Sequence, residues 1–183
     1  MKDHAQRMRT RFTVDLSAYP DLVVIYLGLR VNSLRGLFPA LQFGHKLKQA
    51  VKENPAGLLR HELLFFSLYP LHLGIRQYWR DFESLERWAR SSVHAGWWKS
   101  FVQRPTGYGL WHETYFIRGG MEAIYGDVPP PLGLTGFAPI RPATGAGFSS
   151  RSRLQVTGEQ TVAPPISESE IPPRDVPPVP PPE

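Results

Sequence analysis

The chain has 183 residues, of which 42% are hydrophobic and 20% are charged, and this length suits one domain of ordinary size better than two. It contains no cysteine, which excludes disulfides, thiolate nucleophiles, iron–sulfur clusters and cysteine-type zinc sites, so we expect a reduced, cytoplasmic setting. The formal net charge of +5 comes from basic residues spread along the first 128 positions rather than gathered in one block, so we expect no nucleic-acid partner.

Proline divides the chain, because 14 of its 19 prolines fall between Pro129 and Pro182. A proline-rich segment buries too little apolar surface to fold and favours the polyproline II conformation. We therefore expect an N-terminal arm over residues 1–19, one folded domain over residues 20–137 and a disordered Pro-rich tail over residues 138–183. The polar N-terminus predicts no secretory signal, and the apolar runs are shorter than the ~20 residues that span a bilayer, so we expect no membrane association.

The first half of the domain reads as a strand, a helix and two strands. The β-branched, apolar run at residues 21–31 predicts a strand that is buried on both faces. Apolar residues at spacings of three and four over residues 39–51 predict an amphipathic helix, with Ser33 as a cap ahead of it. Two further apolar runs, at residues 58–69 and 71–80, predict a hairpin because a proline forces a turn between them.

The second half of the domain adds another helix and another strand. Apolar side chains recur at three- and four-residue steps over residues 85–101, which predicts a second amphipathic helix capped by Asp81 or Ser84. The aromatic run at residues 108–117 predicts a fourth strand, and residues 121–125 predict an edge strand or an exchanged segment. The order β-α-β-β-α-β is that of the α+β ferredoxin-like fold, in which two helices cover one face of a four-stranded antiparallel sheet.

This fold leaves the other face of the sheet bare. The strands carry many large apolar side chains, including Phe65, Phe66, Tyr78, Trp79, Trp111 and Tyr115. A bare face with so much apolar surface is unfavourable in water. We therefore expect a homodimer in which two sheets pack face to face.

Motifs of the common nucleotide-binding and hydrolytic mechanisms do not occur in the sequence, and what stands out is a set of 22 aromatic residues with histidines among them. His112 lies within the fourth strand, so its side chain and that of the adjacent Glu113 point to opposite sides of the sheet. If His112 faces the two helices, its neutral imidazole can accept a proton or bind iron. The alternative is a core histidine that is held by hydrogen bonds.

Three further candidates each have a functional and an ordinary interpretation. His94 lies near Gly96 in the second helix, where glycine indicates a bend or a close approach, although a helix-terminal histidine also favours the helix dipole. His61 alternates with leucines on an apolar strand face, which favours a structural role. Arg76 either binds an acidic substrate or pairs with Glu62.

Several blocks of sequence occur in an order and at spacings that carry a family resemblance: Arg76-Gln-Tyr-Trp-Arg-Asp-Phe-Glu-Ser-Leu-Glu-Arg-Trp-Ala-Arg90, His94-Ala-Gly-Trp97, Gly109-Leu-Trp-His-Glu-Thr-Tyr115, Glu122-Ala-Ile-Tyr-Gly126 and Pro131-Leu-Gly-Leu134. Over about residues 20–137 the chain resembles the fumagillin-pathway monooxygenase-like family, once known only as a domain of unknown function. The resemblance implies a dimeric α/β barrel related to the antibiotic-biosynthesis monooxygenases.

The resemblance leaves the chemistry open, because one fold hosts many activities. The wider group includes cofactor-independent oxygenases, haem-degrading enzymes and haem-containing aldoxime dehydratases. The haem-degrading relatives use a helical histidine as the axial ligand, and the corresponding candidate here is His94, unless Trp97 or Trp98 takes the equivalent place.

The first hypothesis is a monooxygenase-like oxidoreductase that needs no cofactor and acts on a hydrophobic small molecule between sheet and helices. The residues expected to line its pocket are Trp79, Trp97, Trp111, Tyr115 and Arg76. Its expected base is His112, assisted by Glu113 or His94, which removes a proton to give a carbanion that reacts with oxygen.

Two alternatives remain from the sequence. One is a haem protein in which His94, His112 or His61 binds the iron, with no other metal site expected. The other is a non-catalytic homodimer that binds a hydrophobic small molecule or organises a complex through its polyproline tail.

Overall fold

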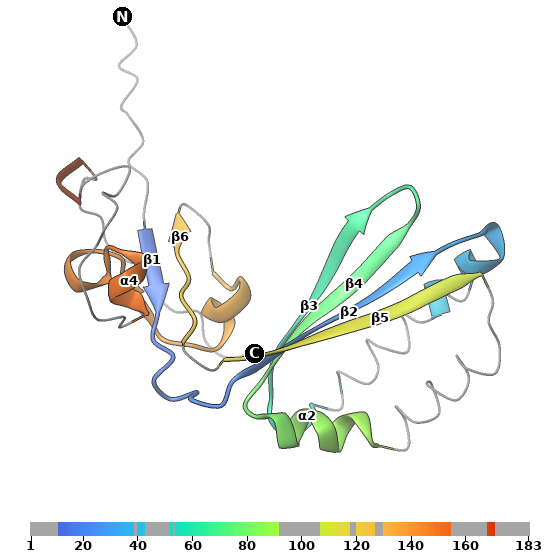
Figure 1. The fold of residues 1–183 in the computed structure, drawn as a ribbon, viewed down its shortest axis with the longest axis horizontal. Helices are drawn as coiled ribbons and strands as arrows, with labels where there is room; N and C mark the ends of the chain where they lie inside the picture. Colours follow the sequence, from blue (N-terminus) through green and yellow to red (C-terminus); the bar gives the residue numbers. More distant parts are fainter. Residues whose placement is uncertain are drawn as a thin grey trace, which may run out of the picture. The chain divides into compact units, whose positions relative to one another are not determined.

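A computed structural model gives the structure of the chain, and it describes residues 11–38, 40–42, 52, 54–91, 107–117, 120–126, 130–154 and 168–170 (Figure 1). The chain divides into two compact units. Residues 21–118 form one unit, and residues 1–20 together with residues 119–183 form the other. The first of these units contains all the predicted catalytic and binding residues.

A four-stranded sheet is the centre of the first unit (Figure 1). Its strands are β2 (Val23–Val31), β3 (Leu58–Ser67), β4 (His72–Trp79) and β5 (Tyr108–Phe116). They lie side by side in the order β3-β4-β2-β5, and each neighbouring pair is antiparallel. This is the strand order of the split βαβ motif, so the predicted α+β ferredoxin-like fold is confirmed.

Helix α2 (Phe82–Ala89) packs on one face of this sheet (Figure 1). It begins after Asp81, whose carboxylate accepts a hydrogen bond from the backbone N–H of Ser84 at 2.7 Å. This bond satisfies one of the unpaired donors of the first turn, and it lowers the pKa of Asp81. Leu85 then packs with the indole of Trp79 in one buried cluster, which anchors the helix to the sheet.

A second buried cluster lies on the same face, near the other end of β2. It joins Leu29 and Val31 to Ala40, which belongs to helical residues 37–38 and 40–42. We call the face that contacts Leu85 and Ala40 the helix side of the sheet, and the opposite face the far side. Ser33 precedes the 3-10 turn η1 (Leu34–Gly36), but its side chain makes no capping hydrogen bond, so this predicted cap is wrong.

The second unit contains a three-stranded antiparallel sheet in the order β6-β1-β7. Its strands are β1 (Arg11–Val14), β6 (Tyr125–Gly126) and β7 (Ile140–Pro142). Two expectations are corrected by it, because part of the N-terminal arm forms a strand and β6 extends this sheet rather than the four-stranded one. The physical reason is that Phe12 is 1% exposed and stacks on the ring of Tyr125 at 5.4 Å, so the arm has apolar surface to bury.

Regular structure continues past residue 137, the predicted end of the domain. The elements there are η2 (Gly133–Gly136), β7, η3 (Gly145–Gly147), α4 (Ser150–Arg153) and η4 (Glu168–Glu170). The guanidinium of Arg153 donates to Glu122 at 2.8 Å and to the carbonyls of Gly147 and Phe148, which ties α4 to this unit. The expected disorder therefore does not apply to residues 138–154, whereas the polyproline runs lie outside the described residues.

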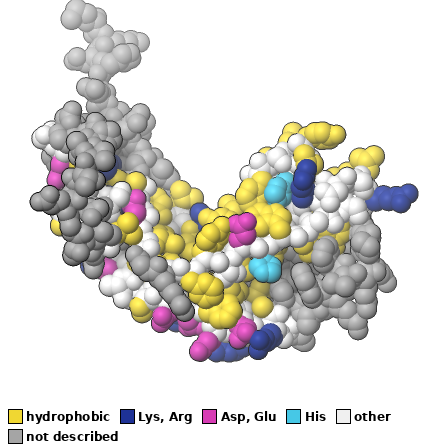
Figure 2. All heavy atoms as spheres, viewed as in Figure 1, with side chains coloured by type: hydrophobic (Ala, Val, Ile, Leu, Met, Phe, Trp, Pro, Cys, Tyr) yellow, Lys and Arg dark blue, Asp and Glu magenta, His cyan; other side chains and the backbone are white. Residues whose placement is uncertain are grey.

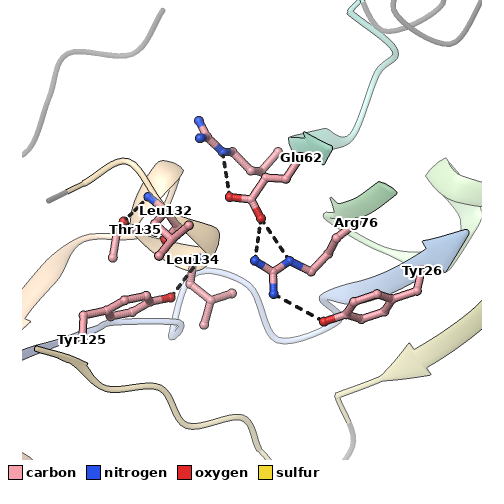
Figure 3. A network of polar contacts seen from close by, with 8 residues as sticks. Tyr26, Glu62, Arg76, Tyr125, Leu132, Leu134 and Thr135 are labelled. Atoms are coloured by element: carbon pink, nitrogen blue, oxygen red, sulfur yellow. Dashed lines mark hydrogen bonds and ion pairs between the residues drawn. The ribbon is translucent and has the colours of Figure 1, made fainter. Parts of the chain in front are cut away.

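The turn η2 is held by side chains of its own unit (Figure 3). The hydroxyl of Tyr125 accepts a hydrogen bond from the N–H of Leu134 at 3.1 Å, and Thr135 bonds back to Leu132.

Across the ranges that the structure describes, no helix is both long and apolar enough to cross a membrane.

Candidate functional site

The register of β5 decides where the predicted site residues point. His112 pairs with Leu27 of β2, while Glu113 pairs with Tyr26 on the same strand. Side chains alternate between the faces of a strand, and Leu27 has the parity of Leu29, so His112 lies on the helix side. Trp111, Glu113 and Tyr115 consequently lie on the far side.

Trp79 lies on the helix side, where it is fully buried and begins a chain of hydrogen bonds. Its indole Nε1–H donates to the side-chain oxygen of Gln77 at 3.2 Å. The amide nitrogen of Gln77 lies 3.3 Å from Nδ1 of His61, which is its partner on β3. The side chains of Trp79, Gln77 and His61 therefore form one hydrogen-bonded chain across β4 and β3.

This polar chain fixes the proton of His61. An indole N–H can only donate, so it holds the oxygen of Gln77 and turns the amide NH2 group toward His61. The NH2 group can only donate as well, so Nδ1 of His61 accepts and a neutral ring carries its hydrogen on Nε2. Burial lowers the pKa of His61, and the charge of Arg60 lowers it further against the opposing effect of Glu62.

His112 has different surroundings although it shares the helix side. Its side chain is exposed, and among the described residues none makes a hydrogen bond or ion pair with its imidazole. The strands β5 and β3 are the two edges of the sheet, so three strand spacings, roughly 14 Å, separate His112 from His61. The two histidines cannot act on the same atom of a small substrate.

The far side carries a row of polar side chains across all four strands, Glu62, Arg76, Tyr26 and Glu113. Figure 3 shows the first three of them. The guanidinium of Arg76 donates to one oxygen of Glu62 at 2.7 and 3.0 Å and to the hydroxyl of Tyr26 at 3.4 Å. It also lies over the rings of Tyr26 and Tyr78, at 5.9 and 5.4 Å. Burial lowers the pKa of Arg76, but these bonds outweigh it, so the net shift is upward and the group stays charged.

This finding selects between the two interpretations of Arg76, because its guanidinium is already paired with Glu62. At the other end of the row, the hydroxyl of Tyr115 donates to the carboxylate of Glu113, and this bond raises the pKa of Tyr115. The hydrophobic surface over the strands is accordingly broken by charged side chains (Figure 2).

Next to the polar row, two glycines let aromatic rings lie against the far side. Gly28 and Gly74 pair with each other, and a Cβ atom on Gly28 would lie 2.2 Å from Nε1 of Trp111. A Cβ atom on Gly74 would lie 2.4 Å from the ring of Phe66. The indole N–H of Trp111 donates to Nε2 of His72 at 2.8 Å, which holds the ring in place.

The predicted pocket residues are thus divided between two faces. Trp79 and His112 lie on the helix side, whereas Trp111, Glu113, Tyr115 and Arg76 lie on the far side. Trp79 is also enclosed in the core, so it lines no solvent-accessible surface. His94, Trp97 and Trp98 lie outside the described residues.

Sequence reasoning missed two residues of this region. Gln77 was passed over because a glutamine inside a strand gives no signal until its partners across the sheet are known. His72 was missed for the same reason, since its partner Trp111 is 39 positions away. Only the strand parity that places His72 and Arg76 on one face was readable in the sequence.

The described residues do not build a haem site. An axial histidine needs a free lone pair, but Nε2 of His61 carries the hydrogen, and Nε2 of His72 accepts from Trp111. Histidines that bind metals also donate their other ring N–H to an orienting partner, and His112 has none among the residues described. Within the same ranges, no group of three or more His, Cys, Asp or Glu side chains is arranged to hold a metal ion.

Comparison with known proteins agrees with this fold. The family model described as monooxygenase af470-like matches residues 22–134, and the chain belongs to that family. The match confirms the resemblance to a monooxygenase-like family. No curated protein matches the chain.

Solved structures of similar fold include two of aldoxime dehydratase. One, in complex with butyraldoxime, is 22% identical, with a TM-score of 0.62 over 80% of this chain and 42% of that chain. Another is 23% identical, with a TM-score of 0.53 over 67% of this chain and 36% of that one. The chain spans less than half the length of these proteins, and at such identities the likeness shows the fold alone.

A third structure is SnoaB, a cofactor-independent oxygenase from Streptomyces nogalater. It is 15% identical and covers 54% of this chain and 94% of its own, with a TM-score of 0.41. A likeness at this level carries no argument about the reaction.

Proposed function

We propose that the protein is a monooxygenase-type oxidoreductase that acts on a hydrophobic small molecule. The observation that carries this proposal is the family match over residues 22–134, which includes the whole four-stranded sheet. We further propose that the enzyme works as a cytoplasmic homodimer. The exposed rings of Phe66 and Tyr115 on the far side support a partner there, and sedimentation equilibrium of the full chain tests the dimer.

The proposed base is His112, because its imidazole on the helix side has no partner among the described residues. It would remove a proton from a carbon that is acidified by neighbouring aromatic or carbonyl groups. The carbanion then gives electrons to dioxygen, and loss of water leaves a ketone. The net change, CH2 plus O2 to C=O plus H2O, balances without a reductant because the substrate supplies all four electrons.

Glu113 has a smaller place in this scheme than the sequence suggested. It lies on the other face of the sheet, where it accepts a hydrogen bond from Tyr115. A carboxylate in that position cannot accept the proton directly from the carbon that His112 deprotonates. We therefore propose that His112 acts without it.

Measuring oxygen uptake by the full chain tests whether His112 is the general base. Anthrone and benzoylacetone are suitable probes, since each has an acidified methylene group. The His112→Ala variant should lose oxygen uptake by about 100-fold or more, the usual contribution of a positioned base. His72→Phe replaces a histidine on the opposite face and should keep it. Full activity in His112→Ala would remove the proposed base.

The haem alternative has less support from the described histidines. Nε2 of His61 carries hydrogen, and Nε2 of His72 already accepts a hydrogen bond from Trp111. Titration of the purified protein with haem, followed by Soret absorbance, tests it directly. A stoichiometric Soret band that disappears in His112→Ala would overturn the cofactor-free reaction and replace it with the haem hypothesis.

The non-catalytic alternative requires a truncation that keeps β7 and α4 of the second unit. Removing every residue after position 140 would delete most of β7 and all of α4, so the cut belongs after Leu154. An enzyme should keep its oxygen uptake after this truncation. A protein that organises a complex through its polyproline tail should lose its partner instead.

A further inference from the structure

One polar atom on the helix side is used by nothing described so far. Nε2 of His61 is shielded from solvent, and no described residue makes a hydrogen bond with it. Because Trp79 and Gln77 fix the hydrogen on this atom, it is a buried donor and not a buried lone pair. Buried donors are nearly always paired in native proteins, so an unpaired one calls for an acceptor from elsewhere.

The surroundings of this donor define what it can bind. Across the sheet, Gln77 is followed by Ile25, and the next row on the same face contains Leu63 and Ile75. These side chains are apolar, and the neighbouring charges of Arg60 and Glu62 lie on the far side. A neutral donor among apolar side chains suits a neutral oxygen better than a carboxylate or phosphate, because burying an unpaired charge is costly.

The donor is also present at neutral pH without a positive charge. Burial lowers the pKa of His61, so the ring is neutral where most enzymes work. A neutral ring held by Gln77 keeps one orientation, whereas an unanchored imidazole could offer either nitrogen. The chain Trp79, Gln77, His61 therefore presents one defined N–H group on the helix side.

We propose that the Nε2–H group of His61 binds the carbonyl oxygen of a hydrophobic, neutral ketone or quinone. This inference rests on the proposed function, because it places the substrate or product of that reaction on the helix side. His61 is then a positioning residue, roughly 14 Å across the sheet from the proposed base, so it would hold the far end of a polycyclic molecule. The expected ligand class is a fused-ring aromatic ketone.

The first test is direct observation of the proton. Nuclear magnetic resonance of the full chain with ¹⁵N-labelled histidine reports which ring nitrogen of His61 carries hydrogen, and His61→Phe assigns the signal. The proposal requires hydrogen on Nε2 at pH 8. Hydrogen on Nδ1 would overturn it, because that tautomer offers a ligand no donor at Nε2.

The second test compares two ligands that differ by one oxygen. 1-Tetralone has an acceptor oxygen on an apolar bicycle, and tetralin is the same bicycle without it. The full chain should bind 1-tetralone about 3- to 10-fold more tightly than tetralin, the gain expected of one hydrogen bond. His61→Phe should bind both equally, whereas the matched variant His72→Phe should keep the preference.

In this second test, two outcomes overturn the proposal: equal binding of the two ligands by the unmodified chain, or a preference that survives in His61→Phe. If His61→Phe fails to fold, the unmodified chain still decides, because only 1-tetralone should shift the Nε2 proton signal. Neither readout needs oxygen or turnover. A protein that prefers 1-tetralone through His61 but consumes no oxygen would therefore refute the proposed reaction and leave this binding site standing.

Discussion

Replacing Gly28 by alanine tests whether the paired glycines exist to seat aromatic rings on the sheet. The new Cβ atom would lie 2.2 to 2.6 Å from three atoms of the Trp111 indole, so the ring must move. A displaced indole loses its hydrogen bond to His72, worth about 0.5–1.5 kcal/mol, and its packing, worth about 1–3 kcal/mol. Alanine itself favours a strand over glycine by about 0.5–1 kcal/mol, so we expect a net loss of about 1–3 kcal/mol.

Urea unfolding followed by circular dichroism measures this loss in the full chain. Gly109→Ala is the matched control, because among the described residues a Cβ atom there meets only Asn32, at 3.5 Å, and the stability of this variant should be unchanged or slightly higher. In a Trp111→Ala background the sign should reverse, so that Gly28→Ala becomes stabilising by about 0.5 kcal/mol. Our account fails if Gly28→Ala is neutral in the natural sequence, or equally costly with and without the indole.

Three further predictions concern stability. Asp81→Ala removes the cap of α2 and should lower the free energy of unfolding by about 1 kcal/mol in the same urea assay. Glu62→Gln leaves the guanidinium of Arg76 without its counter-charge and should lower the free energy of unfolding by about 1–3 kcal/mol. The control Glu86→Gln, in an exposed ion pair, should lower it by less than about 0.5 kcal/mol, and equal losses would contradict the argument. The pKa of His61 is lower in the folded chain than its usual 6.5, so the unfolded chain takes up the proton first and stability should fall as the pH drops below about 6.5. His61→Phe should lack this part of the pH dependence, and identical pH profiles would show that burial does not depress the pKa.

Local periodicity explains why the strands and helix α2 could be predicted. Each strand of the four-stranded sheet begins and ends within two residues of its predicted bounds, since apolar, β-branched runs bounded by turns carry their own signal. The same two-residue period predicted that His112 and Glu113 point to opposite faces of the sheet before their surroundings were known. The cap at Asp81 was readable because it lies three residues from its partner.

Contacts between distant positions had no such signal. The strand β1 pairs with β6 and β7, more than 100 positions along the chain, so the N-terminal arm looked unstructured by itself. The sequence also offered six aromatic residues for the bare face, yet the register places Trp79 with the helix cluster and brings Trp111 to His72. Strand register decides which side chains meet, and the sequence of one strand alone does not specify that register.

The sequence alone determined the fold class, the order of the strands and helices, and which residues of a strand share a face, because these follow from local hydrophobic period and chain direction. Tertiary structure decided that Glu62 neutralises Arg76, that β1 is a central strand and that Gln77 sets the proton of His61. These facts depend on which atoms three-dimensional packing places within hydrogen-bond distance. A histidine that looked structural in the strand pattern therefore became a candidate donor only when its neighbour on β4 was known.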